Sequence, residues 1–474
     1  MGSIPERNVT GQAGSDSPGV FVWLGMGLAN WSQRWFPDAF VFALAGLIIV
    51  FVAGLFAGVG MRDLIKYFGD GFWGLIPFTM QMAMIIIGGY VVATSPPVHR
   101  LIRTLAKVPR TPRGAVAFVA FFAMATSLVS WGLSVIFSGI LVREIVRNVR
   151  GIDYRAIGAA AYLGPGSVWA LGLSSSAALV MATPASIPAA LLKISGVIPL
   201  SQTIYTWQSA ATVAILMVSC VTVALLSTPT RSAKDAESFG VTEGLEVKEL
   251  EERRTPAEWL EYAPALSLLI GILGLAYLAQ VLAAKGPLAA LDLNTYNLLF
   301  LMAGLLLHWR PRSFVRAVND AVPATAGILI QFPFYGGIFG IITLSSIAGR
   351  LAHFFVSFSS ANTYPILVSI YSGILGMFVP SGGSKWIIEA PYVLQAAKDL
   401  HVNLGWVVQI YNTSEALPNL INPFWMLPLL GVLKVKARDL IGYGLLYFLA
   451  NSVLVLFFMW FFARTLPYVP PVIP

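Results

Sequence analysis

The chain has 474 residues, of which 57% are hydrophobic and only 11% are charged. A soluble domain carries roughly 25% charged residues, so this composition excludes a soluble globular protein and indicates an integral protein of a lipid bilayer. The formal net charge of +8 would suggest a nucleic-acid partner in a soluble chain. Here the basic residues cluster in short loops between apolar runs, as the positive-inside rule expects, so we predict no nucleic-acid partner.

The apolar runs predict how often the chain crosses the membrane. A hydrocarbon core of about 30 Å needs roughly 20 apolar residues in a helix. The N-terminal tail, residues 1–38, precedes these runs, and within it 19–36 is expected to be an amphipathic helix on the membrane surface. About nine transmembrane helices are predicted, near residues 39–60, 72–95, 156–185, 205–227, 260–283, 294–307, 318–346, 404–433 and 439–463.

Residues 114–142 form an apolar stretch that does not fit a single crossing. Basic clusters lie on both of its sides, at 100–113 and 143–155. A single crossing would place one cluster outside, against the positive-inside rule. A re-entrant hairpin with its tip near Ser130-Trp-Gly132 keeps both clusters, and the N-terminus, on the cytoplasmic side. A second re-entrant hairpin is predicted on the outer side, at 362–398.

The two halves of the chain follow the same order of elements. Residues 39–227 predict span, span, hairpin, broken span and span. The same order recurs with opposite orientation within 260–474, after one extra span, and the polar segment 228–259 is expected to be a cytoplasmic linker. The broken spans are marked by Ser174-Ser-Ser-Ala-Ala-Leu179 and Asn412-Thr-Ser-Glu-Ala-Leu417. The predicted fold is an all-α polytopic membrane protein of inverted repeats, with two re-entrant hairpins and two broken helices.

Paired interruptions in the two halves of a membrane protein indicate a transporter with its substrate site near the midplane. A helix break offers free N–H groups to a carboxylate and free C=O groups to Na⁺, while Ser, Thr and Asn side chains add neutral oxygen ligands. For any single serine the alternative is a hydrogen bond to its own helix. The candidate substrate- and ion-binding residues are Ser127, Ser130, Gly132, Ser134, Ser174, Ser175, Ser176, Thr183, Ser381, Gly382, Gly383, Ser384, Lys385, Glu389, Asn412, Thr413, Ser414, Glu415, Asn419 and Asn422.

Three of these candidates are charged, and a charge within a membrane segment is costly enough to indicate function. Lys385 follows a Ser-Gly-Gly-Ser turn and could meet a substrate carboxylate, take the place of a bound cation, or lie at the water-facing mouth of the hairpin. Glu415 could take a proton, help to bind a cation, or pair with Lys385. The chain shows no nucleophile–base pair, phosphate loop or metal motif, so we expect neither enzyme activity nor a cofactor.

The chain resembles the short-chain fatty acid transporter family over residues 20–465. The likeness is most specific at Phe378-Val-Pro-Ser-Gly-Gly-Ser-Lys-Trp386, Glu389-Ala-Pro391 and Asn412-Thr-Ser-Glu-Ala-Leu-Pro-Asn-Leu-Ile-Asn-Pro-Phe-Trp425. Known members are linked to acetoacetate and butyrate uptake, and the family stands with the dicarboxylate/sodium symporters in the ion transporter superfamily. The resemblance implies a homodimer in the cytoplasmic (inner) membrane, with a scaffold domain and a mobile transport domain that work by an elevator mechanism.

The chain departs from the Ser-Asn-Thr motif that the dicarboxylate/sodium symporters carry at each hairpin tip and helix break. Ser130-Trp-Gly132 and Ser384-Lys-Trp386 replace it at the hairpins, Ser174-Ser-Ser176 replaces it at the first break, and Asn412-Thr413 matches it in part. Na⁺ is therefore only a candidate coupling ion, at Ser130, Ser174, Ser384 and Asn412. Lys385 could do the work of one cation, and a lone positive charge suits a monocarboxylate.

Together these features predict a secondary transporter of short-chain monocarboxylates, coupled to Na⁺ or H⁺. The alternatives are a dicarboxylate or other organic-anion carrier of the same superfamily, and a passive facilitator or channel.

Overall fold

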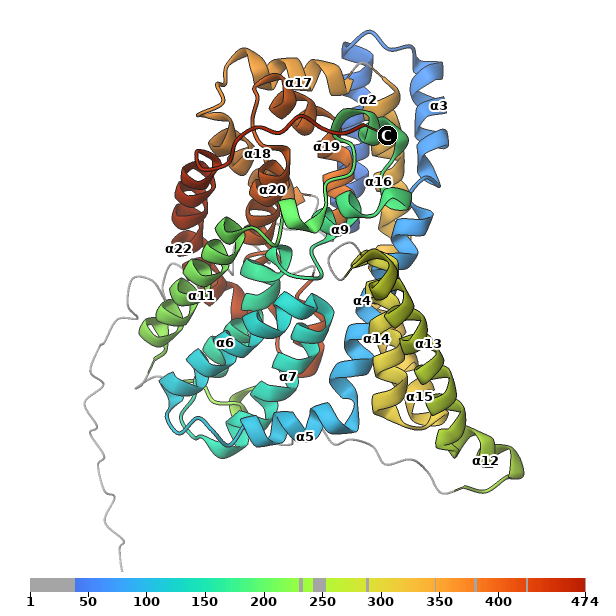
Figure 1. Cartoon of the computed structure of the whole chain (residues 1–474). Coiled ribbons are helices and arrows are strands. Elements are labelled where there is room, and N and C mark those ends of the chain that lie inside the picture. Colours follow the sequence, from blue (N-terminus) through green and yellow to red (C-terminus); the bar gives the residue numbers. More distant parts are fainter. Residues whose placement is uncertain are drawn as a thin grey trace, which may run out of the picture.

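A computed structural model describes residues 39–229, 233–241, 253–286, 290–345, 347–378, 382–422 and 425–473. Every regular element in this part of the chain is helical (Figure 1). The surface helix predicted at 19–36 lies outside the described residues. The helices of the first half are α2 (Ala39–Phe56), α3 (Met61–Phe72), α4 (Ile76–Thr94), α5 (Pro96–Leu105), α6 (Pro112–Val129), α7 (Trp131–Asn148), α8 (Tyr154–Ala161), the π-helix η1 (Gly164–Val168), the 3-10 helix η2 (Trp169–Leu171), α9 (Ser176–Ala182), α10 (Ala189–Ser195) and α11 (Trp207–Ser227).

The second half repeats this series after two additional helices, α12 (Pro256–Tyr262) and α13 (Pro264–Lys285). Its elements are α14 (Leu293–His308), α15 (Pro311–Ala321), α16 (Ala326–Leu344), α17 (Ile347–Ser357), α18 (Tyr364–Phe378), α19 (Gly382–Asp399), α20 (Leu404–Asn419), α21 (Leu427–Leu433) and α22 (Ala437–Ala463). The contacts recur as well as the order. Helix α4 packs on α7 as α16 packs on α19, and α6 packs on α11 as α18 packs on α22.

Seven helical segments of the described residues are long and apolar enough to cross a membrane, which agrees with the predicted polytopic all-α fold. One of them is Pro112–Val129, an arm of the first predicted hairpin. The predicted spans at 39–60, 294–307 and 404–433 are not among the seven. The helices at the first two places are apolar but shorter. Helix α20 ends at Asn419 and carries polar side chains from Asn412 to Glu415, which lower its hydropathy.

The first hairpin forms where it was predicted. Helices α6 and α7 pack on each other and meet at Ser130, whose backbone is extended (φ −156°, ψ 123°). Its two arms have 18 residues each and together run from Pro112 to Asn148, beyond the predicted range of 114–142. In the second hairpin, α18 and α19 flank residues 379–381, which lie outside the described part of the chain. The position of either hairpin within a membrane stays a prediction.

The first broken helix is interrupted as expected, between η2 and α9, around Ser174. The position predicted for the second break is wrong. Helix α20 runs through Asn412 and Thr413 without interruption, and the chain leaves the helix only after Asn419. The amide of Asn412 donates to Gln409 Oε1 (2.8 Å) and the hydroxyl of Thr413 donates to the Gln409 carbonyl (2.6 Å). These side chains bond back along their own helix and do not open it.

The helices gather into two groups. On the right of Figure 1 lie α2, α3, α4 and α13–α16, and on the left and at the centre lie the two hairpins, the broken helices, α11 and α22. Helices α4 and α16 of the first group pack directly against α7 and α19 of the second. The hairpins and helix breaks are thereby brought to the boundary between the two groups.

Candidate substrate and ion site

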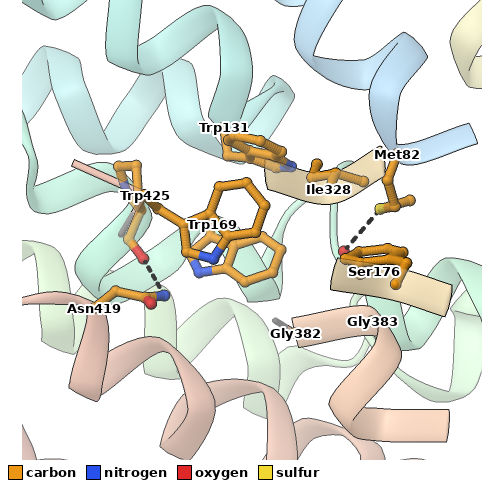
Figure 2. Close-up of a pocket in the computed structure, with 11 residues that line it drawn as sticks. Met82, Trp131, Trp169, Ser176, Ile328, Gly382, Gly383, Asn419 and Trp425 are labelled. Carbon is orange, nitrogen blue, oxygen red and sulfur yellow. Dashed lines mark hydrogen bonds between the residues drawn. The ribbon is translucent and has the colours of Figure 1, made fainter. Parts of the chain in front are cut away.

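A cavity lies at this boundary (Figure 2). Its volume is only about 30 Å³, so a ligand of several carbons needs its walls to move. The walls are mostly aromatic and aliphatic, with few polar groups, as in many small-molecule sites. The lining residues are Met82, Trp131, Pro165, Trp169, Ser176, Ile328, Phe332, Gly382, Gly383, Asn419 and Trp425.

Three helices begin at the cavity wall. Trp131, Ser176 and Gly382 are the first residues of α7, α9 and α19, and each lines the cavity. A helix N-terminus carries a partial positive charge and N–H groups without a partner inside the helix, so it favours an anion. Three such ends around an apolar cavity suit a small molecule with one anionic group and a hydrocarbon body.

Buried serines hold the first hairpin tip against the first helix break. The Ser174 hydroxyl accepts the backbone N–H of Trp131 (3.0 Å), and the Leu173 N–H donates to the Leu128 carbonyl (2.6 Å). The Ser130 hydroxyl caps α7 by accepting the Leu133 N–H (3.2 Å), and the Ser175 hydroxyl caps α9 in the same way. The serines therefore fix the directions of two of the three helix ends.

The start of α19 needs two glycines because it passes close to its neighbours. A methyl group on Gly382 would lie 2.6 Å from Cη2 of Trp169 and 3.7 Å from Cγ of Glu415. A methyl group on Gly383 would lie 2.1 Å from Cζ of Phe78 and 3.1 Å from Cβ of Ser176. The N-termini of α9 and α19 are thus in close contact, and Glu415 lies directly behind the cavity wall.

Behind Gly382 lies a buried cluster of Lys385, Glu389 and Glu415, here called the charge cluster. The Lys385 ammonium is 2.7 Å from Glu389 Oε1 and 2.9 Å from Glu415 Oε2, and it donates to the Ser372 carbonyl (3.0 Å). The exposed fractions of the three side chains are 0%, 0% and 1%. Lys385 is therefore not at a water-facing mouth. It pairs with both carboxylates, which was one of the open alternatives for Glu415.

An aromatic side chain connects the charge cluster to the cavity wall. The Lys385 ammonium lies 4.3 Å from the ring centre of Tyr411, a cation–π contact. The phenol of Tyr411 donates a hydrogen bond to the Gly382 carbonyl (2.7 Å). Tyr411 thus contacts both the charge cluster and the first turn of α19.

The other predicted site residues lie around this centre, and among them Asn419 also lines the cavity. Ser134 donates to the Ala123 carbonyl (2.6 Å), and Thr183 donates to the Leu179 carbonyl (2.6 Å). Gly132 packs against α4, and the hydroxyls of Ser127 and Ser414 have no hydrogen-bond partner among the described residues. The amides of Asn419 and Asn422 donate to the Pro165 and Met377 carbonyls. Ser381 lies outside the described residues, and Ser384 is placed only by its backbone in α19.

The apolar walls were missing from the predicted site. Trp131 lies within the first hairpin tip and Trp425 ends the motif that begins at Asn412. A tryptophan next to a predicted helix break could have indicated a place in the cavity wall. Met82, Ile328 and Phe332 had no such signal, because they sit in unbroken apolar helices. Two polar partners were missed as well, because each lies inside a continuous helix. Ser372 donates to Glu389 of the charge cluster, and Tyr411 donates to the Gly382 carbonyl.

Comparison with known proteins identifies the chain. The model of the family described as "Short chain fatty acid transporter" matches residues 22–462. The chain belongs to this family. A protein of Escherichia coli (strain K12) named "Putative short-chain fatty acid transporter" is 35% identical over 430 residues, which cover 90% of this chain and 96% of that protein. A protein of Haemophilus influenzae with the same name is 31% identical over 429 residues, 88% of this chain and 94% of that protein.

Two solved structures resemble this member of the short-chain fatty acid transporter family in fold. The YdaH transporter of Alcanivorax borkumensis aligns with a TM-score of 0.57 and 15% identity, covering 92% of this chain and 100% of that chain. MtrF of Neisseria gonorrhoeae, described among a class of antimetabolite efflux pumps, aligns with a TM-score of 0.58 and 14% identity, covering 95% and 100%. The family shows that the chain is a membrane transporter and not an enzyme, and the two solved structures share its fold.

Proposed function

We propose that this protein is a secondary active transporter of short-chain monocarboxylates such as acetoacetate and butyrate. It works in the cytoplasmic membrane with its N-terminus inside, as a homodimer, and couples transport to Na⁺ or H⁺. The observation that carries the proposal is the convergence of three helix N-termini on a tryptophan-lined cavity beside a buried lysine.

The chemistry of the cavity matches the proposed substrate class. The first turns of α7, α9 and α19 favour one carboxylate, and the indole rings of Trp131, Trp169 and Trp425 give apolar surface for a short hydrocarbon chain. A dicarboxylate would place a second negative charge against these apolar walls, at a large desolvation cost. The family name and the names of the relatives support the same class.

Two kinds of group support coupling to a cation. The hydroxyl oxygens of Ser130 and Ser174 lie at the first hairpin tip, where each accepts one N–H bond and keeps a lone pair for Na⁺. The other two Na⁺ candidates give less support. The Asn412 amide donates a hydrogen bond to Gln409, and Ser384 is placed only by its backbone in α19. The carboxylates of the charge cluster are the candidate acceptors of a proton.

Alternating access by an elevator motion fits the boundary between the two helix groups. Helices α4 and α7 meet there through glycines, since a methyl group on Gly89 would lie 2.4 Å from the backbone nitrogen of Leu133. Small residues keep this part of the boundary free of large side chains, which supports movement of one group along the other. Most of the lining residues belong to the hairpins and broken helices, so such a movement would carry the substrate with them.

The first test is uptake of labelled butyrate and acetoacetate into proteoliposomes, with Na⁺ and proton gradients imposed separately. We expect accumulation above the external concentration with one of the gradients, and competition by other short monocarboxylates. Downhill flux alone would indicate a passive facilitator, and competition by dicarboxylates alone would indicate an organic-anion carrier of another class. No flux of either acid would contradict the proposed substrate class.

The cavity wall offers a second test of substrate class. Trp169→Leu enlarges the cavity next to Gly382, so we expect the preference for hexanoate over butyrate to rise by about tenfold, the effect of added methylenes in an apolar pocket. The matched control is Trp73→Leu, at a side chain that is 65% exposed and does not line the cavity. An unchanged chain-length preference in Trp169→Leu would remove this wall from the substrate site.

A further inference from the structure

The charge cluster is electrostatically unbalanced. Lys385 brings one positive charge and the two carboxylates bring two negative charges, all three fully buried. Isolated charges at such depth are costly, so a group that can neutralise tends to do so. One added proton would bring the cluster to zero net charge.

The two carboxylates are not equivalent. Both oxygens of Glu389 have a partner, since Oε1 receives Lys385 Nζ (2.7 Å) and Oε2 accepts the Ser372 hydroxyl (2.6 Å). Glu415 Oε2 forms an ion pair with Lys385 Nζ (2.9 Å) and accepts no hydrogen bond from another described residue. Glu415 therefore has fewer partners that favour its ionised form than Glu389 has, and it loses less when it is protonated.

Among the charged and titratable side chains around Glu415, Glu415 itself is the best candidate for the proton acceptor. Helix α19 brings the charged Lys385 and Glu389, and α22 has charges only in its first turn, at Arg438 and Asp439. The segments η1, η2 and α9 have no titratable side chain. The phenols of Tyr335, Tyr364 and Tyr411 donate elsewhere, to Gln331, Val393 and Gly382. Tyr371 and Tyr392 share one hydrogen bond with each other, and no contact of either with Glu415 is found among the described residues.

We propose that Glu415 is the proton-coupling residue of this transporter and that one proton moves with each monocarboxylate. The proposal rests on the proposed function and chooses H⁺ over Na⁺ as the coupling ion. The proton passes from water on one side of the membrane to Glu415 Oε2 and is later released to water on the other side. Lys385 keeps its own protons and stays paired with Glu389.

The position of Glu415 connects the proton to the substrate. Gly382 lies between the Glu415 side chain and the cavity, and it begins the helix whose N-terminus attracts the carboxylate. With Glu415 ionised, the net negative charge of the cluster opposes an anion in the cavity. Protonation removes this repulsion, so proton and anion each raise the affinity of the site for the other. Loaded and empty carriers then have the same net charge, and transport does not depend on the membrane potential.

The test compares Glu415→Gln with the purified wild-type protein in proteoliposomes that contain a pH-sensitive dye. In the wild type, an inward proton gradient should drive butyrate accumulation, with one proton entering per butyrate and no effect of membrane potential. Glu415→Gln resembles the protonated state. It should still exchange labelled for unlabelled butyrate, without acceleration by acid pH, and proton-driven accumulation should fall by about tenfold or more.

The matched control is Glu144→Gln, another buried glutamate, which lies near the far end of α7 and should keep the wild-type pH profile. Undiminished proton-driven accumulation in Glu415→Gln would overturn the proposal, and so would accumulation driven by Na⁺ alone in the wild type, which would leave the proposed function intact. If Glu415→Gln does not fold, the wild-type proton count decides, because zero protons per butyrate also overturns the proposal. Absence of any butyrate exchange in the wild type would overturn the proposed function as well.

Discussion

The two hairpins occupy corresponding places in the two halves, but they carry different chemistry. The fourth residue of α7 is Ser134, and the fourth residue of α19 is Lys385. Each donates a hydrogen bond to a backbone carbonyl of the preceding helix, Ser134 to Ala123 and Lys385 to Ser372. Both carbonyls lie six residues before the last residue of their helix. The same bridge is thus made once by a neutral hydroxyl and once by an ammonium.

The difference extends one turn further along each helix. The eighth residue is Ser138 in α7 and Glu389 in α19, so the first hairpin stays neutral where the second holds an ion pair. The Ser138 hydroxyl has no hydrogen-bond partner among the described residues and costs little to bury, whereas buried charges indicate a role beyond packing. In the proposed mechanism the first hairpin orients helix ends toward the substrate, and the second also takes part in coupling to the proton.

The largest effect on the difference between the two hairpins is expected from removal of the Lys385 ammonium. Lys385→Met leaves two carboxylates buried without their partner, so we expect a loss of about 3–5 kcal/mol in stability and no accumulation of butyrate. Thermal unfolding of the detergent-purified protein and proteoliposome uptake measure the two effects. The triple change Lys385→Met, Glu389→Gln, Glu415→Gln removes the stranded charges and should recover much of the stability without proton-driven accumulation. Full stability and uptake in Lys385→Met alone would refute a role for the cluster.

A smaller effect is expected from crowding the start of α19. Gly383→Ala places a methyl group against the Phe78 ring and Ser176, which should cost about 1–3 kcal/mol and reduce butyrate uptake by displacing the helix end. Gly69→Ala is the matched control, because a methyl group there meets nothing within 4 Å on the exposed helix α3. Equal thermal stability and equal uptake in the two variants would show that the close approach at Gly383 is not needed.

The smallest effect is expected from a change in the first hairpin, which carries the neutral hydroxyl. Ser134→Ala removes the hydroxyl that bonds to the Ala123 carbonyl, so we expect a loss of about 0.5–1.5 kcal/mol and an unchanged dependence of uptake on pH. The pH profile of butyrate accumulation, measured beside that of Glu415→Gln, checks this. If Ser134→Ala abolished proton-driven accumulation, the first hairpin would share the role assigned to the charge cluster.

The sequence by itself determined the membrane class, the order of the elements, the tip of the first hairpin at Ser130 and the break around Ser174. These depend on local properties, namely the length of apolar runs, the cost of basic residues outside, and the tolerance of Ser and Gly for irregular backbone. It also singled out Lys385, Glu389 and Glu415, because any charge in an apolar run is conspicuous.

Only the tertiary structure decided which groups meet. The pairing of Lys385 with Glu415 joins α19 to α20, and the cavity joins side chains from α4, α7, α16, α19 and both broken helices. The second break lies after Asn419 and not at the predicted Asn412, because the side chains of Asn412 and Thr413 bond within their own helix. Such outcomes depend on packing and on competition between partners far apart in sequence, which composition and periodicity do not contain.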